Sequence, residues 1–432
     1  MVTHRKTEIF IYLFFLNTRF IRMKMIINTG NIRVGGMLQV SLSFLHELRN
    51  FPDHEYHVFL SPEVERQIRK DRFPENFRFY SFLRYSGYSA TLMRKWMIYK
   101  RLRRLQLLEK VIVPDVVFSV FGPTYWKPKA PHVAGFATPH YIYPESPYFS
   151  EVPFSHRIKQ SLFGRLRLSL MMRNIDYLIA ETEEVRQRLI NHLHIDENRV
   201  FHISNTLNEI YNEPQKWTYR AKLPPREPGE LRLVTISANH LFKNLSVINE
   251  VINQVRILRP ALNIKFILTL HRREFENLGT NRRYVHFTNR LNVDECPFLY
   301  SQCDFMFLPT LLECFSASYP EAMKMGLPIL TSDLAFARGV CGQAALYFDP
   351  VDARDIAKKI VFLHENPDLQ KKMRAEGKIR LREFGSAGER AAHYLRIAEL
   401  AAQSPSSQKK GLHSGITLPS LLMSSAPANP IV

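Results

Sequence analysis

One stretch decides how this chain folds: residues 309–323, which read PTLLECFSASYPEAM. The apolar run before it, Asp304–Leu308, is typical of a buried strand, and the residues after it have the spacing of a helix that begins at Tyr319. The stretch carries one carboxylate in the loop, Glu313, and a second, Glu321, in the first turn of that helix. A strand, a polar loop and a helix in this order form the repeating unit of a parallel α/β sheet. Ligands bind at such loops.

These groups are suited to a sugar nucleotide. Backbone N–H groups at a helix N-terminus attract phosphate or other ligand oxygen atoms, and a carboxylate such as Glu321 accepts hydrogen bonds from two neighbouring hydroxyls of a ribose or hexose. The residues alone leave a second interpretation open, because Ser318 and Glu321 have the spacing of a capping box. In that case Glu321 only satisfies backbone N–H groups at the start of the helix.

The alternation of strands and helices continues on both sides of this stretch. Strands are predicted in the first half at Met25–Asn28, Tyr56–Leu60, Val116–Val120, His132–Phe136, Tyr177–Ala180 and Val200–Ile203, and in the second half at Arg232–Ile236, Ile264–Leu270, Asp304–Leu308 and Pro328–Thr331. Helical patterns lie between them, so the sheets should be parallel. We therefore expect an α/β protein with two doubly wound Rossmann-like domains that face a central cleft.

Domain boundaries follow from the same patterns. The 432 residues exceed the roughly 250–300 that one hydrophobic core supports. We expect an N-terminal extension at 1–22, a first domain at 23–213, a proline-rich linker at 214–230, a second domain at 231–402 and a disordered tail at 403–432. The extension imitates a signal peptide but lacks a small-residue cleavage site, so we expect Met23 or Met25 to be the biological start.

Composition and charge exclude several classes of protein. Hydrophobic residues make up 45% of the chain, which excludes a disordered protein, and no apolar run reaches the roughly 18 residues of a membrane span. The four cysteines form no Cys-x-x-Cys pair, and neither Asp-x-Asp nor a His/Asp cluster with metal-ligand spacing occurs. We therefore expect no metal and no disulfide framework, and a reducing cytoplasm suits the chain. A net charge of +19 favours anionic partners.

Three further polar groups follow predicted strands. Lys243, in residues 237–245 (SANHLFKNL), lies where its ammonium group can neutralise a diphosphate, and the alternative is a solvated lysine. Gly35 and Gly36 open a helix and allow a backbone to approach a phosphate, although such a pair is more often a plain turn. His140 follows a strand and is as often structural as functional.

The motif with two glutamates resembles a known signature. Glu313-x7-Glu321, followed by residues 322–329 (AMKMGLPI), is similar to the pattern of retaining glycosyltransferases of family 4, which have the GT-B fold. The resemblance extends from about residue 25 to residue 400 and is most specific between residues 231 and 350. It implies an acceptor-side N-terminal domain and a nucleotide-sugar-binding C-terminal domain. Asn205 matches the asparagine that the family has before the linker, and we expect it to fix a loop.

The resemblance also implies roles for the matching residues. Glu313 would contact the donor hexose near the reacting centre, Lys243 would hold the diphosphate, and His140 would lie close to the donor sugar, which makes these three the expected catalytic residues. Glu321 would bind the ribose hydroxyls. The other expected donor-binding residues are Phe315, Ser316, Ala317, Gly35, Gly36 and His240. The family has Gly at 314 and 316, Pro at 318 and Arg at 238, where this chain has Cys314, Ser316, Ser318 and Ala238.

The function implied by the resemblance is transfer of a hexose from a UDP- or GDP-sugar to a hydroxyl of a glycan or lipid-linked glycan acceptor. The family retains the anomeric configuration, uses no metal and no cofactor beyond the sugar nucleotide as co-substrate, and builds cell-surface polysaccharide. Ala238 and the changed glycine positions leave an alternative, a catalytically weak GT-B homologue that acts as a binding partner in a glycan-assembly complex. Nucleic-acid binding is not expected, because the basic stretches lack a helix-turn-helix or aromatic RNA-binding pattern.

Two basic stretches concentrate the charge. Residues 94–110 contain seven basic residues against Glu109, and residues 156–173 contain five basic residues and no acid. Basic amphipathic helices that carry Trp96 and Tyr99 suit an anionic membrane surface. The alternative is that their apolar stripes pack on the sheet. A peripheral location at the inner face of the plasma membrane is the resulting hypothesis.

Overall fold

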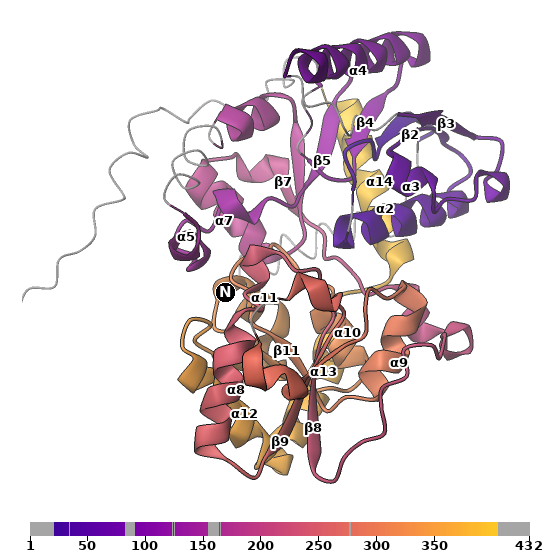
Figure 1. Ribbon diagram of the computed structural model, residues 1–432. Coiled ribbons are helices and arrows are strands. Elements are labelled where there is room, and N and C mark those ends of the chain that lie inside the picture. The colour runs from indigo at the N-terminus through magenta and orange to yellow at the C-terminus, as the bar shows by residue number, and fades with distance from the viewer. Residues whose placement is uncertain are drawn as a thin grey trace, which may run out of the picture.

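The chain forms two α/β domains, which lie one above the other in Figure 1. The structure, a computed structural model, describes residues 21–33, 35–82, 91–122, 124, 126–153, 164, 166–275 and 278–404. Every strand pair in the two sheets of these residues is parallel. The predicted class, two doubly wound Rossmann-like domains in the GT-B arrangement, is confirmed.

The N-terminal sheet contains seven strands: β1 (Lys24–Asn28), β2 (Glu55–Leu60), β3 (Phe77–Ser81), β4 (Val116–Ser119), β5 (His132–Phe136), β6 (Tyr177–Ala180) and β7 (Val200–His202). Their order across the sheet is β3-β2-β1-β4-β5-β6-β7. The central strands are apolar along their length, since a parallel sheet that is covered on both faces buries every side chain. The order reverses between β1 and β4, so the loops that follow these two neighbours diverge.

The C-terminal sheet contains six strands: β8 (Glu230–Thr235), β9 (Asn263–Leu268), β10 (Val285–Phe287), β11 (Phe305–Leu308), β12 (Ile329–Ser332) and β13 (Ala345–Phe348). Their order is β10-β9-β8-β11-β12-β13, so this sheet reverses between β8 and β11. A reversal of this kind is where doubly wound sheets bind ligands.

Helices cover the sheets with their apolar stripes. They are α2 (Gly36–Glu47), α3 (Pro62–Glu65), α4 (Thr91–Ile112), α5 (Tyr148–Glu151), α7 (Glu183–Leu193), α8 (Val247–Leu258), α9 (Cys296–Ser301), α10 (Ser318–Lys324), α11 (Ala335–Cys341), α12 (Ala353–His364), α13 (Pro367–Leu381) and α14 (Ala387–Gln403). In α8, for example, Ile248, Val251, Ile252 and Val255 are all buried. Their helical spacing gives one apolar face, which packs with α12 on β8, β9 and β11.

The last helix, α14, packs on the N-terminal domain, although its sequence position falls at the end of the range predicted for the second domain. Its Tyr394 ring lies 5.1 Å from Phe44 of α2 and 5.2 Å from Phe118 of β4. In Figure 1 this yellow helix runs beside α2 and the N-terminal sheet. The N-terminal core is therefore completed by residues from the end of the described chain.

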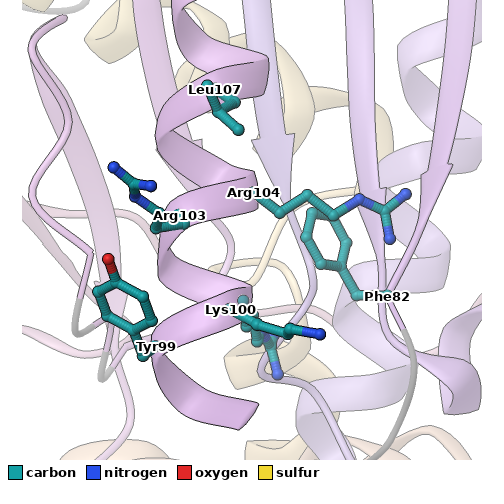
Figure 2. A pocket seen from close by; sticks show the side chains of 7 residues that line it. Phe82, Tyr99, Lys100, Arg103, Arg104 and Leu107 are labelled. Carbon is teal, nitrogen blue, oxygen red and sulfur yellow. The ribbon is translucent and has the colours of Figure 1, made fainter. Parts of the chain in front are cut away.

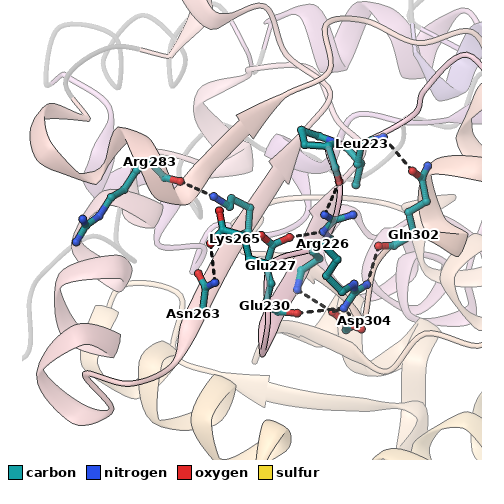
Figure 3. Close-up of polar contacts among 11 residues, drawn as sticks. Leu223, Arg226, Glu227, Glu230, Asn263, Lys265, Arg283, Gln302 and Asp304 are labelled. Atoms are coloured by element: carbon teal, nitrogen blue, oxygen red, sulfur yellow. Dashed lines mark hydrogen bonds and ion pairs between the residues drawn. The ribbon is translucent and has the colours of Figure 1, made fainter.

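The linker is fixed to the C-terminal domain (Figure 3). Arg226 donates to both carboxylate oxygens of Asp304, at 2.9 and 2.7 Å, and to the carbonyl oxygen of Gln302 at 2.9 Å. The backbone N–H of Leu223 donates to Oε1 of Gln302 at 2.9 Å. Glu227 accepts a hydrogen bond from Asn263 of β9. The second half of the linker thus belongs structurally to the domain that follows it.

The two domains share one apolar cluster. It includes Tyr143 from the N-terminal domain and Phe336 of α11, whose rings pack edge to face with 6.0 Å between centroids. A buried hydrogen bond also crosses the boundary, because Oγ of Ser146 donates to the carbonyl oxygen of Leu311 at 2.6 Å. The domains therefore meet through packed side chains beside the loop that carries Glu313.

Some expectations fall outside the described residues, which omit residues 1–20, half of the basic stretch 156–173 (residues 156–163 and 165), and the tail from residue 405. Three strands were not predicted, β3, β10 and β13, and all three lie at sheet edges. An edge strand has one unpaired side, so its sequence is less apolar than that of a central strand. Within the described part of the chain, every helix is too short or too polar to span a bilayer.

Candidate active site

The candidate site lies where the C-terminal sheet reverses its strand order. Because β8 and β11 are neighbours, the loops that follow them, residues 236–246 and 309–317, start side by side. The carbonyl oxygen of Phe242 ties the loops together: it accepts from the N–H of Leu311 at 2.7 Å and from Oγ1 of Thr310 at 3.1 Å. The polar residues that the sequence places after these strands are thereby brought to one place.

Lys243 and Glu313 form an ion pair across these two loops. Nζ of Lys243 contacts Oε1 of Glu313, and Oγ1 of Thr310 donates to the same oxygen at 3.1 Å. Both side chains are largely buried, with exposed fractions of 14% for Lys243 and 12% for Glu313. Partial burial strengthens the attraction between the two charges relative to water.

The position of Lys243 is set by the turn around it. Asn244 adopts a left-handed conformation with φ of 52°, which asparagine tolerates better than most residues. Its side chain donates to the carbonyl oxygen of Pro350 at 2.8 Å. Lys243 therefore ends a short turn (Leu241–Lys243) that precedes α8.

The carboxyl group of Glu321 contacts a tyrosine hydroxyl instead of a cation. The hydroxyl of Tyr300 donates to its Oε2 at 3.3 Å, and the buried hydroxyl of Tyr211 lies near the same carboxyl group. Burial raises the pKa of Glu321 to about 7, and the tyrosine hydroxyls oppose that rise. At neutral pH this carboxyl group is therefore divided between its protonated and ionised forms.

The interpretation of Glu321 as a helix cap is wrong. The residue at the N-cap of α10 is Ala317, which has no capping side chain, and Oγ of Ser318 donates to the carbonyl oxygen of Ile236 at 3.3 Å. The capping-box pair is thus absent from this described helix. The carboxyl group of Glu321 is left for another partner.

The turn between the two glutamates contains the expected residues Phe315, Ser316 and Ala317 immediately before α10. Cys314, Ser316 and Ser318, which replace residues usual in the family, are buried. Burial raises the pKa of the Cys314 thiol well above its ordinary value, so this cysteine is a packing residue and not a nucleophile. The three replacements are accommodated inside the protein.

Two of the expected histidines meet at Phe242, a residue that the sequence reasoning missed. The exposed His240 ring stacks on Phe242 with 5.2 Å between centroids, and His140 approaches the same ring edge-on at 6.5 Å. His140 lies in the N-terminal domain after β5, so this contact joins the two domains beside Lys243. An aromatic residue between a histidine and a lysine in a loop after a strand was the signal that could have identified Phe242.

Gly35 and Gly36 are exposed at the start of α2, in the loop that follows β1. Gly35 has φ of 71°, which L side chains rarely adopt, and a Cβ atom built on either glycine meets nothing within 4 Å. The space in front of them is open. In the described part of the chain neither glycine is hydrogen-bonded to the loops of Lys243 or Glu313.

A buried carboxyl group that the sequence reasoning did not select, Glu181, follows β6. Nδ2 of Asn205 donates to its Oε1 at 2.8 Å, and Oδ1 of Asn205 accepts from Nη1 of Arg390 at 2.5 Å. Burial raises the pKa of Glu181 to about 8, Asn205 and Arg390 oppose the rise, and the charge of Glu313 adds to it. Its place directly after a strand, the criterion that selected His140, could have identified it.

Two family models match the chain, one in each domain. The model described as Glycosyltransferase Family 4 matches residues 34–209, and the model described as Glycosyl transferases group 1 matches residues 248–380. The second match contains both Glu313 and Glu321.

Individual proteins are similar as well. The serotype-specific mannosyltransferase WbdA of Escherichia coli is 25% identical over 197 residues, which are 42% of this chain and 24% of that protein. The match thus spans about a quarter of the relative's length.

Three solved structures have a similar fold. A glycosyltransferase from Rickettsia africae has a TM-score of 0.63 at 14% identity, covering 89% of this chain and 100% of that chain. WaaG, a glycosyltransferase involved in lipopolysaccharide biosynthesis, has a TM-score of 0.61 at 14% identity, covering 87% of this chain and 99% of that chain. Anabaena HepE in complex with UDP and glucose has a TM-score of 0.59 at 14% identity, covering 89% of this chain and 100% of that chain. At these identities the likeness shows the fold alone.

Proposed function

We propose that this chain, which belongs to the glycosyltransferases with two Rossmann-like domains, transfers a hexose from a UDP- or GDP-sugar. The acceptor is a hydroxyl of a glycan or lipid-linked glycan. The transfer retains the anomeric configuration, requires no metal and contributes to a cell-surface polysaccharide. The functions of the similar proteins WbdA and WaaG support a role in polysaccharide synthesis, and the complex of HepE with UDP and glucose supports a UDP-sugar donor.

The observation that carries the proposal is the ion pair of Lys243 and Glu313 at the reversal point of the C-terminal sheet. A sugar nucleotide presents a negative diphosphate next to the hydroxyls of a hexose and a ribose. Lys243 supplies the positive charge for the first, Glu313 accepts hydrogen bonds from the hexose, and Glu321 accepts them from the ribose.

Lys243 acts on the leaving group. Negative charge on the diphosphate increases as the glycosidic bond breaks, and a nearby ammonium group stabilises that state more than the ground state. The partly buried position of Lys243 increases this effect, because the surrounding protein screens charges less than water does. The three N–H donors of the ammonium group allow it to hold Glu313 and a phosphate oxygen together.

In the proposed chemical step the anomeric configuration is retained, and no side chain of the enzyme acts as a nucleophile. The bond between the anomeric carbon and the phosphate oxygen breaks, and the acceptor oxygen bonds to the same face of that carbon. The acceptor proton passes to the leaving phosphate oxygen. Glu313 stabilises the positive charge that develops on the hexose ring. His140 lies beside this site, because its ring contacts Phe242, the neighbour of Lys243.

Membrane attachment at the inner face of the plasma membrane is the proposed setting, with α4 as the contact. Along this helix Trp96, Tyr99 and Leu107 are exposed large hydrophobic side chains among basic residues. Leu105 and Ile112 of the same helix are buried against the sheet, so the helix both packs and presents an exposed face.

The test is a donor panel. The protein is incubated with UDP- and GDP-sugars, and released nucleotide and transferred sugar are measured with and without EDTA. We expect one donor to be consumed in the wild type, with EDTA without effect, and Glu313→Gln to lower turnover by about 100-fold while the donor still binds. Donor binding without any turnover in the wild type would instead favour the catalytically weak homologue. NMR of the product linkage checks retention.

A further inference from the structure

A cavity lies along α4, in the other domain from Lys243, Glu313 and Glu321. Its volume is about 320 Å³, and it is lined by Phe82, Tyr99, Lys100, Arg101, Arg103, Arg104 and Leu107 (Figure 2). Phe82 directly follows β3, and the other residues belong to α4. The lining therefore combines four cations with two aromatic rings and a leucine, a composition that the proposed sugar-nucleotide chemistry does not use.

The positive charge of this cavity is not compensated by its own helix. Glu109 is the one acidic residue in the sequence of α4, and it is buried, with Oε1 accepting from the backbone N–H groups of Lys129 at 2.5 Å and Ala130 at 3.1 Å. Among the ion pairs of the described residues, none involves Lys100, Arg103 or Arg104. A cluster of cations without carboxylates attracts an anion.

Four cations of α4 lie over aromatic rings, and one of them is Arg101, whose Cζ is 5.7 Å from the ring centroid of Phe82. Nζ of Lys100 is 3.6 Å from the ring centroid of Trp96, and Cζ of Arg103 is 5.8 Å from that of Tyr99. Cζ of Arg104 is 4.9 Å from the centroid of Phe82, and Figure 2 shows this arginine beside the ring. A ring contact of this kind uses no N–H donor in a hydrogen bond, so the donors stay available to phosphate oxygens.

Arg101 connects the cavity to the loop of Gly35 and Gly36. Its Nη2 donates to the carbonyl oxygen of Gly30 at 2.5 Å and to Oδ1 of Asn31 at 3.3 Å. A Cβ atom built on Gly30 would lie 2.7 Å from that nitrogen, so a larger residue at this position would displace the end of the Arg101 side chain. The cavity thus adjoins the ligand-facing end of the N-terminal sheet, where β1 ends.

We propose that this cavity binds the phosphate group of a lipid-phosphate acceptor. Lys100, Arg103 and Arg104 hold the phosphate, and the apolar side chains of Tyr99 and Leu107 contact the beginning of the lipid chain. The inference rests on the proposed function, since it names the class of acceptor. The cavity offers cations to a phosphate and apolar side chains to a lipid chain. A free anion would contact only the cations and would leave the exposed Leu107 without a partner.

The binding experiment uses soluble short-chain lipids below their micelle concentration. Isothermal titration calorimetry compares dihexanoyl phosphatidic acid, dihexanoyl phosphatidylcholine and inorganic phosphate on the full chain. We expect phosphatidic acid to bind at least tenfold more tightly than either of the others. Equal affinity for inorganic phosphate would reduce the site to an anion site, and equal affinity for phosphatidylcholine would reduce it to an apolar surface. Either result overturns the proposal.

Matched variants locate the site. Lys100→Ala, Arg103→Ala and Arg104→Ala together remove three positive charges from exposed positions, and we expect at least tenfold weaker binding of phosphatidic acid. Lys358→Ala, Lys371→Ala and Lys372→Ala remove the same charge from α12 and α13, and we expect unchanged binding. Equal loss in both triple variants would show a net-charge effect and overturn the proposal. Unfolding midpoints confirm that both variants fold.

The outcome is independent of the donor chemistry. Binding of phosphatidic acid is measured without a sugar nucleotide, so a failure of the donor panel leaves this measurement intact. Conversely, the α4 triple variant is expected to bind the donor as the wild type does, because Lys243, Glu313 and Glu321 lie in the other domain. A variant that loses both ligands would point to a folding defect, which the unfolding midpoints identify.

Discussion

The ammonium group of Lys243 contacts the carboxylate of Glu313, and the two residues belong to loops that follow neighbouring strands. Glu321, in the same motif as Glu313, contacts a tyrosine hydroxyl instead and makes no ion pair among the described residues. The two carboxyl groups of the motif therefore have different partners. Their functions should be separable by substitution.

Substitution of Glu321 and substitution of Glu313 are expected to affect different steps, donor binding and turnover. Glu321→Ala should weaken donor binding by about tenfold or more, because a hydrogen bond to a charged group contributes about 1.5–3 kcal/mol. Glu313→Ala should lower kcat by about 100-fold with a smaller change in donor affinity. Calorimetry with the donor and steady-state kinetics separate the two effects. Full activity and affinity in both variants would contradict the assignment of the motif.

Replacement of Lys243 should act mainly on the rate. Lys243→Ala removes the charge that faces the leaving diphosphate, so kcat should fall by more than KM rises. Lys243→Arg keeps the charge but changes its shape, and it should retain part of the activity. Initial rates over a range of donor concentrations give both constants. An unchanged kcat in the alanine variant would remove Lys243 from the mechanism.

Donor binding should depend on pH through Glu321. Burial raises the pKa of this carboxyl group to about 7, and the ionised form accepts hydrogen bonds from ribose hydroxyls. Below that pH the protonated form dominates, so the donor Kd should rise by about tenfold for each further unit. Calorimetry between pH 5.5 and pH 8.5 measures this, and Glu321→Gln serves as the control. A wild-type profile as flat as that of the glutamine variant would contradict the role of this carboxyl group.

Glu181 should make stability depend on pH. Its pKa is about 8 in the folded protein, against 4.5 for an ordinary glutamate, so the folded state holds a proton that the unfolded state has released between these values. Stability should therefore fall as pH rises through this range, by up to about 1.4 kcal/mol per unit. Arg390, Asn205, Glu313 and the Cys314 thiol surround or act on this group.

The control for this effect is Glu181→Gln, which keeps the size of the side chain and cannot ionise. Urea unfolding at pH 5 and pH 8 should show a smaller loss of stability in the variant than in the wild type. The same loss in both proteins would assign the pH dependence to other groups.

Vesicle binding should depend on salt if α4 contacts a membrane. Reversal of the exposed cations by Lys100→Glu, Arg103→Glu and Arg104→Glu should release the protein from anionic vesicles, since each basic residue near the surface contributes about 1 kcal/mol. Arg101 is left unchanged because it supports the loop at Gly30. Sedimentation with anionic and neutral vesicles at low and physiological salt measures the effect. Equal partitioning of both proteins onto both kinds of vesicle would exclude electrostatic attachment.

Local patterns were sufficient to predict the central strands and most helices. Strands such as His132–Phe136 and Tyr177–Ala180 have the predicted bounds, because a buried parallel strand is a short apolar run between turns. The edge strands β3, β10 and β13 were not predicted, since they have less apolar surface to bury. Periodicity also could not indicate that α14 returns to the first domain, because an apolar stripe does not specify which surface it covers.

The site was predictable in its residues but not in its contacts. Glu313, Glu321 and Lys243 were selected because each follows a strand, and a doubly wound sheet brings the ends of β8 and β11 together. The ion pair of Lys243 with Glu313 depends on the turn at Asn244, whose left-handed conformation no spacing rule specifies. The surroundings of Glu181 include Arg390 of α14, which packs on the same domain but is so far along the chain that local reasoning does not connect the two residues.

The return of α14 to the N-terminal domain affects how the protein is made in the cell. Tyr394 and Leu395 belong to the core around Phe44 and Phe118, so the first domain cannot complete that core while the ribosome is still adding the second. The emerging N-terminal half keeps an apolar surface uncovered until α14 has been made, which exposes it to chaperones and to aggregation. Synthesis of α14, rather than of the seven strands of the first sheet, is then the step after which this core can form.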